Sequence, residues 1–259
     1  MTEKKVAIAV KDLVKTFGEH TVLDHVNLEI YKGETFVILG GSGSGKSTLL
    51  RIMTGGIKPT SGKVLFGGQD TSQLSSAEEE KVKRRFGMSF QSSALLDFLT
   101  VEDNVSLPLR EHTRLDQNII SIIARMKLSL VGLTGFEKFY PGMISGGMKK
   151  RVGVARAIAM DPEVVFYDEP TAGLDPVVCA VVDNLILDLT KKLNLTSIVV
   201  THNMESVFRI ADRVAMIYKG KVLQVGTPGE IKSSQNAITH QFINGFMEGP
   251  IQLNDQSGE

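Results

Sequence analysis

A glycine-rich segment, Gly40–Ser47 with the sequence GGSGSGKS, carries residue types that bind phosphate groups. It matches the pattern G-x-x-x-x-G-K-[ST], and it lies between a short apolar run, Thr35–Leu39, and a helix-like stretch, Lys46–Met53. Glycines let backbone N–H groups close around phosphate oxygens, and a helix N-terminus adds unpaired donors and a positive dipole. A flexible Gly/Ser turn is the alternative, and the strand–turn–helix setting disfavours it. We expect Lys46 to reach the β- and γ-phosphates of a nucleotide and the Ser47 hydroxyl to bind Mg²⁺.

A second apolar run, Val164–Tyr167, ends in two acidic residues, Asp168 and Glu169. Open α/β sheets bind their ligands at the carboxyl ends of the strands. We expect Asp168 to hold Mg²⁺ through water or indirect contacts, and Glu169 to polarise an attacking water as general base or as water-positioning group. A solvated acidic turn explains this run equally well by itself, but the phosphate-binding segment upstream favours the catalytic interpretation.

A second loop of small residues, Ser145–Met148, precedes an Ala-rich helical stretch, Val152–Met160. Such a loop at a helix start can present N–H groups and a hydroxyl to an anion. In isolation, a simple turn followed by a solvated basic patch is the favoured interpretation. Gln91, Asp175 and His202 each end a predicted strand or follow a turn, and singly each is best explained as an ordinary polar residue.

The elements that must position these residues alternate between strands and helices. A block from about residue 92 to 160 is mostly helical, which indicates a parallel-sheet core with a helical insertion. The further predicted strands are Val6–Val14, Val22–Ile30, Ser197–Val200, Arg213–Ile217 and Lys221–Val225, the last two forming a hairpin. The further predicted helices are Ser76–Arg85, Val101–Gly135 with Pro108 as an early break, and Val177–Leu193.

The composition of the 259 residues excludes some classes of protein. Basic and acidic residues both number 29, so the chain is not a nucleic-acid binder held by bulk electrostatics. The single cysteine, Cys179, cannot form an internal disulfide, and its apolar surroundings predict a buried thiol. The stretch Ile119–Leu133 is interrupted by Arg125 and Lys127 and is too short to span a bilayer. We therefore expect any membrane-spanning part to belong to another subunit.

Taken together, the motifs resemble those of the ABC ATPase family over nearly the whole chain. GGSGSGKS resembles the Walker A loop, VVFYDEP resembles Walker B with its catalytic glutamate, and SGGMKKR resembles the signature motif. Gln91 matches the Q-loop glutamine, AGLD at Ala172–Asp175 matches the D-loop, and His202 matches the switch histidine. Phe17 lies where the family has an aromatic ring that stacks on adenine.

The resemblance implies a fold, cofactors and a mechanism. The fold is α/β, a P-loop NTPase (RecA-like) parallel-sheet core with an N-terminal antiparallel β subdomain and an inserted α-helical subdomain. The cofactors are ATP and Mg²⁺, and ATP hydrolysis drives transport by a homodimer in which Ser145 and Gly147 of one subunit touch the γ-phosphate bound by the other. His202 would hold the γ-phosphate and the attacking water, and Gln91 would link Mg²⁺ to the membrane subunit. The expected catalytic residues are Lys46, Glu169 and His202; the expected metal-binding residues are Ser47, Gln91 and Asp168; and the expected ATP-binding residues are Phe17, Gly40, Gly41, Ser42, Gly43, Ser44, Gly45, Lys46, Ser47, Thr48, Gln91, Ser145, Gly146 and Gly147.

The chain departs from the family pattern at three positions. Ile144 replaces the usual leucine before the signature, a near-isosteric change with little expected effect. Met148 replaces the usual glutamine, which puts any polar contact at that position in doubt. Phe17 replaces the commoner tyrosine, so stacking is kept and a hydroxyl contact is lost.

Two segments resemble the narrower group of Mla/Mce-type lipid-transport ATPases. They are PLREHT at Pro108–Thr113 and QFINGFMEGP at Gln241–Pro250. This resemblance implies phospholipid transport between bacterial membranes, with the ATPase at the cytoplasmic face of the inner membrane and accessory subunits as further candidate partners. The alternative within the class is an importer ATPase for small polar solutes. ABC-type ATPases of DNA repair and translation carry a long coiled-coil insertion or two cassettes, and a P-loop kinase or GTPase lacks the Ser145–Met148 and His202 elements.

The organisation that follows is one ABC ATPase domain over residues 4–240, with the helical insertion at about 92–160. Residues 241–259 form a tail that is a candidate interaction segment, and its polar end, Leu253–Glu259, is expected to fray. A transmembrane permease subunit is expected to dock near Ser92–Thr100, flanked by Arg110 and His112. Four large apolar residues suit a groove for a short helix of that partner, with Phe98 or Leu99 also expected to enter the core; the four are Leu95, Leu96, Phe98 and Leu99.

Overall fold

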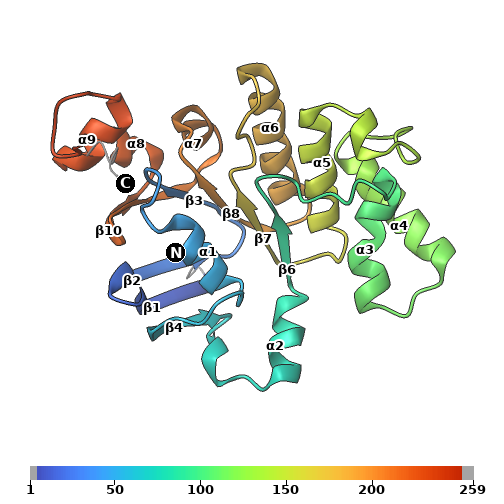
Figure 1. Ribbon diagram of the computed structural model, residues 1–259, viewed down its shortest axis with the longest axis horizontal. Helices are drawn as coiled ribbons and strands as arrows, with labels where there is room; N and C mark the ends of the chain where they lie inside the picture. The colour runs from blue at the N-terminus through green and yellow to red at the C-terminus, as the bar shows by residue number, and fades with distance from the viewer. Residues whose placement is uncertain (1–4, 253–259) are drawn as a thin grey trace.

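Two β-sheets organise the computed structural model, which describes residues 5–252 (Figure 1). The larger sheet has six strands in the order β10-β9-β3-β8-β7-β6, and β10 is its antiparallel edge strand while the other five run parallel. Its central strands are buried on both faces, as their unbroken apolar runs predict. The strands of this sheet are β3 (Thr35–Leu39), β6 (Phe86–Ser89), β7 (Val164–Asp168), β8 (Thr196–Thr201), β9 (Arg213–Tyr218) and β10 (Lys221–Gly226).

The smaller sheet is antiparallel throughout and has the order β2-β1-β4-β5. Its inner face and one face of the larger sheet enclose a common apolar cluster with helix α1 (Lys46–Met53). The N-terminal antiparallel subdomain is therefore confirmed. Its strands are β1 (Val6–Phe17), β2 (His20–Tyr31), β4 (Ser61–Phe66) and β5 (Gln69–Asp70).

The helices from α3 onward pack in one apolar cluster with the other face of the larger sheet, and α3, α4 and α5 extend this layer beyond the β6 edge (Figure 1). These three helices lie within residues 92–160, the range predicted for the helical insertion. Besides α1, the helices are α2 (Ser76–Lys83), α3 (Val101–His112), α4 (Gln117–Leu130), α5 (Gly146–Ala157), α6 (Pro176–Lys192), α7 (Met204–Ile210), α8 (Pro228–Lys232) and α9 (Ala237–Asn244), with single 3₁₀ turns at Thr71–Gln73 and Pro141–Met143.

The predicted break at Pro108 is wrong, because α3 continues through this residue to His112. A proline inside a helix removes one backbone hydrogen bond and costs about 3 kcal/mol. Val101, Val105 and Leu109 lie on one face of α3 and are buried in the core, and their burial offsets this cost. The chain leaves the helix at Thr113 instead.

The sequence makes a prediction about the single cysteine, Cys179. Cys179 is buried as predicted, and burial raises the pKa of its thiol. Among residues 5–252, no helix combines the length and hydrophobicity needed to cross a membrane. The outward face of α4 and the residues just before it nevertheless carry a row of exposed apolar side chains, here called the α4 row, which consists of Leu115 before the helix and Ile119, Ile122, Met126 and Leu130 within it.

Helix α9 crosses the boundary drawn at residue 240, and its Phe242 and Ile243 pack against the main core. Residues 237–244 are thus attached to the domain rather than separate from it. The predicted polar end, Leu253–Glu259, lies outside the described residues.

The segment Ser92–Thr100 is held to α3 by one buried amide. Asn104 is fully buried, and its Oδ1 accepts a hydrogen bond from the Leu96 N–H at 2.8 Å. Its Nδ2 donates to the carbonyl oxygens of Leu96, Leu99 and Thr100 at 3.0–3.2 Å. Buried backbone groups need such partners, so Asn104 fixes the shape of the segment.

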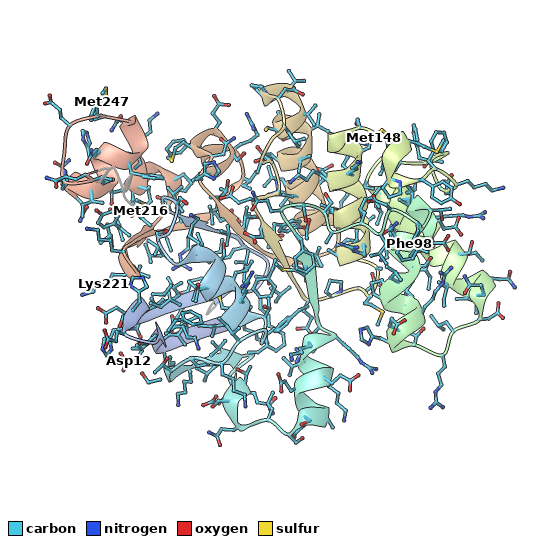
Figure 2. The ribbon with its side chains drawn as sticks, in the orientation of Figure 1. Asp12, Phe98, Met148, Met216, Lys221 and Met247 are labelled. Carbon is cyan, nitrogen blue, oxygen red and sulfur yellow. The ribbon has the colours of Figure 1, made fainter. Side chains whose placement is uncertain are left out.

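The expectation that Phe98 or Leu99 enters the core is wrong for Phe98, and Leu99 is half-buried. Phe98 is 75% exposed and Leu96 is 38% exposed, whereas Leu95 packs against the main core. The loop that Asn104 holds thus turns Leu95 inward and Phe98 outward, beside α3 (Figure 2).

We expect Asn104→Leu to lower the free energy of unfolding by about 3 kcal/mol, because four backbone groups lose a buried partner. Chemical denaturation followed by circular dichroism measures this. Asn118→Ala, on the exposed surface at the start of α4, is the control and should change stability by less than about 0.5 kcal/mol. A loss below about 1 kcal/mol for Asn104→Leu would show that the segment is held in another way.

Candidate active site

The loop between β3 and α1 encloses a small hollow of about 180 Å³, lined by Val22 and by residues 43–48. Gly43 and Gly45 have φ angles of 72° and 100°, a left-handed backbone that suits glycine. A Cβ on Gly45 would lie 2.8 Å from the carbonyl oxygen of Val22. The glycines therefore let the loop turn tightly against β2 and begin α1 with its N–H groups facing the hollow.

Lys46, the first residue of α1, is only 8% exposed. Its Nζ donates hydrogen bonds to the carbonyl oxygens of Gly40 at 2.7 Å and Gly41 at 2.8 Å. Burial lowers the pKa of the Lys46 ammonium, and the negative charges of Glu169 and Asp168 oppose this shift. The loop thus carries a desolvated cation, which attracts phosphate oxygens, and two nearby carboxylates stabilise the charge of that cation.

Glu169 follows β7 in a left-handed conformation, with φ at 47°, and its backbone N–H donates to Val200 on β8 at 2.9 Å. Its Oε1 lies 2.8 Å from Nδ1 of His202, and its Oε2 accepts a hydrogen bond from the Thr201 hydroxyl at 3.2 Å. A non-glycine residue in this conformation is strained, and such strain is often found where a side chain must be aimed. The ends of β7 and β8 thus hold a carboxylate against an imidazole.

Asp168 has a buried oxygen, Oδ1, with no hydrogen-bond partner among the described residues. Burial and the nearby charge of Glu169 raise the pKa of Asp168, and Arg51, Lys46 and Lys150 oppose the rise. An unpartnered carboxylate oxygen in this position suits a bound cation. Mg²⁺ uses few carboxylates together with phosphate oxygens and water, so a single carboxylate oxygen of this kind fits it.

The structure does not bring the Ser145 loop to this hollow. Ser145 caps α5, where its Oγ accepts a hydrogen bond from the Met148 N–H at 3.3 Å. Figure 1 shows the start of α5 well away from α1, on the far side of β7 and β8. Gly147 packs closely against α6. A Cβ at this position would lie only 2.5 Å from Cγ1 of Val178.

Two other expected site residues lie at the periphery. Phe17 ends β1 with 51% of its surface exposed, and the Lys15 amine lies 4.7 Å from its ring centroid. The exposed Gln91 follows β6, and its carbonyl oxygen accepts a hydrogen bond from Nζ of Lys150 at 2.5 Å.

Lys150 is a site residue that the sequence analysis missed, since the basic patch after the Ser145 loop was expected to be solvated. Lys150 is only 8% exposed, and burial lowers the pKa of its ammonium, against the opposing charges of Glu169 and Asp168. The residue spacing could have indicated that Lys150 is buried, because Lys150 shares a helix face with two small residues, Gly153 and Ala157. Thr201, the second missed residue, had no signal beyond its place at a strand end.

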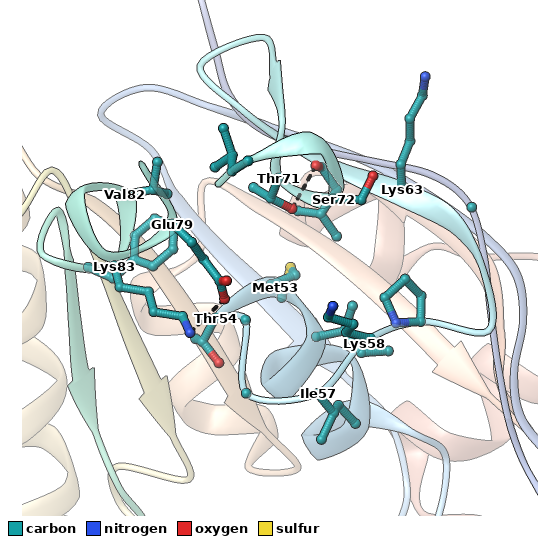
Figure 3. A pocket seen from close by; sticks show the side chains of 18 of the residues that line it. Met53, Thr54, Ile57, Lys58, Lys63, Thr71, Ser72, Glu79, Val82 and Lys83 are labelled. Carbon is teal, nitrogen blue, oxygen red and sulfur yellow. Dashed lines mark hydrogen bonds and ion pairs between the residues drawn. The ribbon is translucent and has the colours of Figure 1, made fainter. Parts of the chain in front are cut away.

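A larger hollow of about 410 Å³ lies elsewhere, between the end of α1, β4 and α2 (Figure 3). Its wall includes Met53 and Val82, and at its side Lys83 pairs with Glu79 at 2.7 Å. The hollow faces the C-terminal end of α1, whose dipole repels anions. Phosphate chemistry therefore belongs to the smaller hollow at the other end of that helix.

Comparison with known proteins agrees with this geometry. The sequence pattern of the family described as "ABC transporter" matches residues 23–172, a span that contains the phosphate-binding loop, Gln91, Ser145 and Glu169. The chain belongs to the ABC transporter family. It is an ATP-binding and ATP-hydrolysing cassette, and the predicted P-loop NTPase fold is confirmed.

Relatives are similar over most of their length. The ABC cassette is 44% identical to the intermembrane phospholipid transport system ATP-binding protein MlaF of Haemophilus influenzae, over 95% of this chain and 93% of the relative. Identity to the MlaF protein of Escherichia coli K12 is 36%, over 97% and 94% of the two chains. A protein of Mycobacterium leprae named probable ribonucleotide transport ATP-binding protein mkl is 39% identical, over 98% of this chain and 73% of the relative.

Solved structures of ABC cassettes have the same fold. A dimeric structure of the ATP-binding cassette MJ0796 in a post-hydrolysis state with ADP and Pi has a TM-score of 0.77 and 32% identity, covering 85% of this chain and 98% of that one. The structure of cbiO1 from Clostridium perfringens, part of an ABC transporter complex, has a TM-score of 0.82 and 30% identity, covering 92% and 95%.

We expect Glu169→Gln to retain ATP binding while ATP turnover falls by roughly 10²–10⁴-fold, because an amide cannot accept the proton of the attacking water. Steady-state phosphate release and binding of a fluorescent ATP analogue measure the two effects. Glu29→Gln removes a carboxylate from the exposed face of β2 and should leave both unchanged. Turnover within threefold of wild type would exclude Glu169 as the residue that activates water.

Proposed function

We propose that this ABC ATPase is the energy-coupling subunit of a transporter that moves phospholipids between bacterial membranes. The observation that supports ATP hydrolysis by this protein is the contact between Glu169 and His202. Similarity over nearly the full length of the H. influenzae protein named for phospholipid transport supports the cargo. The place of action that we propose is the cytoplasmic face of the inner membrane, with the membrane-spanning part supplied by a permease subunit.

In the proposed mechanism the N–H groups of residues 40–48 and the Lys46 ammonium bind the phosphates, and Phe17 stacks on adenine. Lys46 would exchange the carbonyl oxygens of Gly40 and Gly41 for phosphate oxygens. Ser47, Gln91 and Asp168 would hold Mg²⁺, which neutralises charge on the phosphates. Glu169 would then accept a proton from water that His202 helps to orient.

We propose that the working form is a homodimer. In one chain, the start of α5, which Ser145 caps, lies apart from α1, which begins at Lys46 (Figure 1). A loop of small residues at the N-terminus of a helix is suited to binding an anion, and its separation from α1 supports an anion that is bound by another copy of the chain. The Ser145 loop of one subunit would therefore complete the site of its partner.

The permease is proposed to dock on the segment Ser92–Thr100. Its exposed Leu96 and Phe98 are held outward by the bonds of Asn104, and a rigid apolar surface suits a helix of a partner. Arg110 pairs with Asp103 at 2.6 Å at the flank of the segment. An accessory subunit is proposed to bind the α4 row, because its side chains are apolar and exposed.

The second candidate cargo is a small polar solute. The 39% identity to the M. leprae protein named for ribonucleotide transport favours it. The two candidates differ in what co-purifies with the complex, because a phospholipid partitions into detergent and a ribonucleotide does not.

We expect Leu96→Glu to abolish co-purification with the permease, because the charge cannot be buried in the docked state. Val225→Glu on β10 is the matched control, since Val225 and Leu96 are both 38% exposed, and it should leave the complex intact. Both variants should bind ATP and melt within about 4 °C of wild type. The wild-type complex, purified in detergent and extracted for mass spectrometry, should contain phospholipid. An intact Leu96→Glu complex would move the docking surface elsewhere, and a bound ribonucleotide without phospholipid would replace the proposed cargo with the polar one.

A further inference from the structure

Helix α5 carries a buried cation that links two loops of the active site. Nζ of Lys150 donates to the carbonyl oxygen of Gln91 at 2.5 Å and to the carbonyl oxygen of Glu169 at 3.3 Å. These oxygens belong to segments that follow β6 and β7, which are adjacent strands. One side chain thus sets the distance between the backbones of Gln91 and Glu169.

The same face of α5 seats the residues that follow Gln91. Gly153 has no side chain, and a Cβ there would lie 3.4 Å from the Cβ of Ser93. Arg156 donates to the carbonyl oxygens of Ala94 at 2.6 Å and Ser93 at 2.5 Å. Ser93 and Ala94 are both left-handed, with φ angles of 60° and 44°, a conformation that needs support from its surroundings. Lys150 is therefore part of a continuous seat for residues 91–94.

The ammonium group of Lys150 is suited to holding backbone carbonyl oxygens in place rather than only to filling space. Burying an ammonium is unfavourable unless it is hydrogen-bonded and near opposite charge. Both conditions hold, because two carbonyl oxygens accept its hydrogen bonds and the carboxylates of Asp168 and Glu169 stabilise its charge. An apolar residue of similar length could fill the space but could not hold either carbonyl oxygen.

We propose that Lys150 is a positioning residue for ATP hydrolysis, which fixes the Gln91 segment relative to Glu169 and makes both move with α5. This inference rests on the roles proposed above for Gln91 and Glu169. Because Ser145 caps the start of α5, the helix that would meet the partner's nucleotide also holds the Gln91 segment and the backbone of Glu169. Loss of Lys150 should therefore misplace Glu169 without removing any group that binds ATP.

The test compares Lys150→Met, Lys150→Arg and Lys191→Met in the full-length dimer. We expect Lys150→Met to lower kcat by at least about tenfold while KM for ATP changes by less than about threefold, since small misplacement of reacting groups is costly. Lys150→Arg should keep kcat within about threefold, because a guanidinium can donate to both carbonyl oxygens. Lys191→Met removes a charge from the exposed end of α6 and should behave as wild type.

An unchanged kcat in Lys150→Met would overturn the inference, and so would an equal loss in Lys150→Arg or a loss confined to KM. If Lys150→Met does not fold, Lys150→Leu, which also has no donor, replaces it, and a kcat equal to that of Lys150→Arg would overturn the inference in the same way. Wild-type protein without ATPase activity would instead refute the proposed function itself.

Discussion

The active site gathers negative charge at the carboxyl end of β7. The rest of the structure depends on how positively charged groups balance that charge. Asp168 and Glu169 are adjacent and largely desolvated, and the pKa of Asp168 is raised as a result. A nucleotide adds further negative charge beside them. The chain places two buried ammonium groups near this pair, Lys46 at the start of α1 and Lys150 in α5. Without these cations, the carboxylates and phosphates would repel one another at short range.

The order of strands determines which groups meet at that end of β7. Because β8 lies between β3 and β7, its end brings Thr201 and His202 against Glu169 while Lys46 follows β3. Residues separated by more than 150 positions in sequence therefore converge without long loops. The helical block then adds a second connection, since α5 holds the Gln91 segment and Asn104 holds the residues that follow it. A movement of this block would thus be transmitted to the exposed Leu96 and Phe98.

The sequence predicted the parts of the fold that depend on local pattern. Thr35–Leu39 was predicted with the observed ends, and a helix was predicted to begin at Lys46, where α1 begins, because a buried parallel strand and a phosphate-binding loop have strong local signatures. The errors depend on tertiary packing. The helix through Pro108 survives only because its inner face is buried, Phe98 is exposed because Asn104 determines the shape of its loop, and the buried state of Lys150 depends on carbonyl oxygens from β6 and β7. Each of these requires contacts between residues that the local pattern does not connect.

The central claim is that each active site combines Lys46 of one subunit with Ser145 of its partner. Heterodimers purified with two different affinity tags test it directly through their ATPase activity. A dimer of Lys46→Ala with Ser145→Arg places both lesions in one site and leaves the other intact, so it should retain up to about half of wild-type activity. A dimer of wild type with the Lys46→Ala, Ser145→Arg double variant places one lesion in each site and should be inactive. If the second dimer hydrolyses ATP and the first does not, Lys46 and Ser145 act within one chain and the account is contradicted.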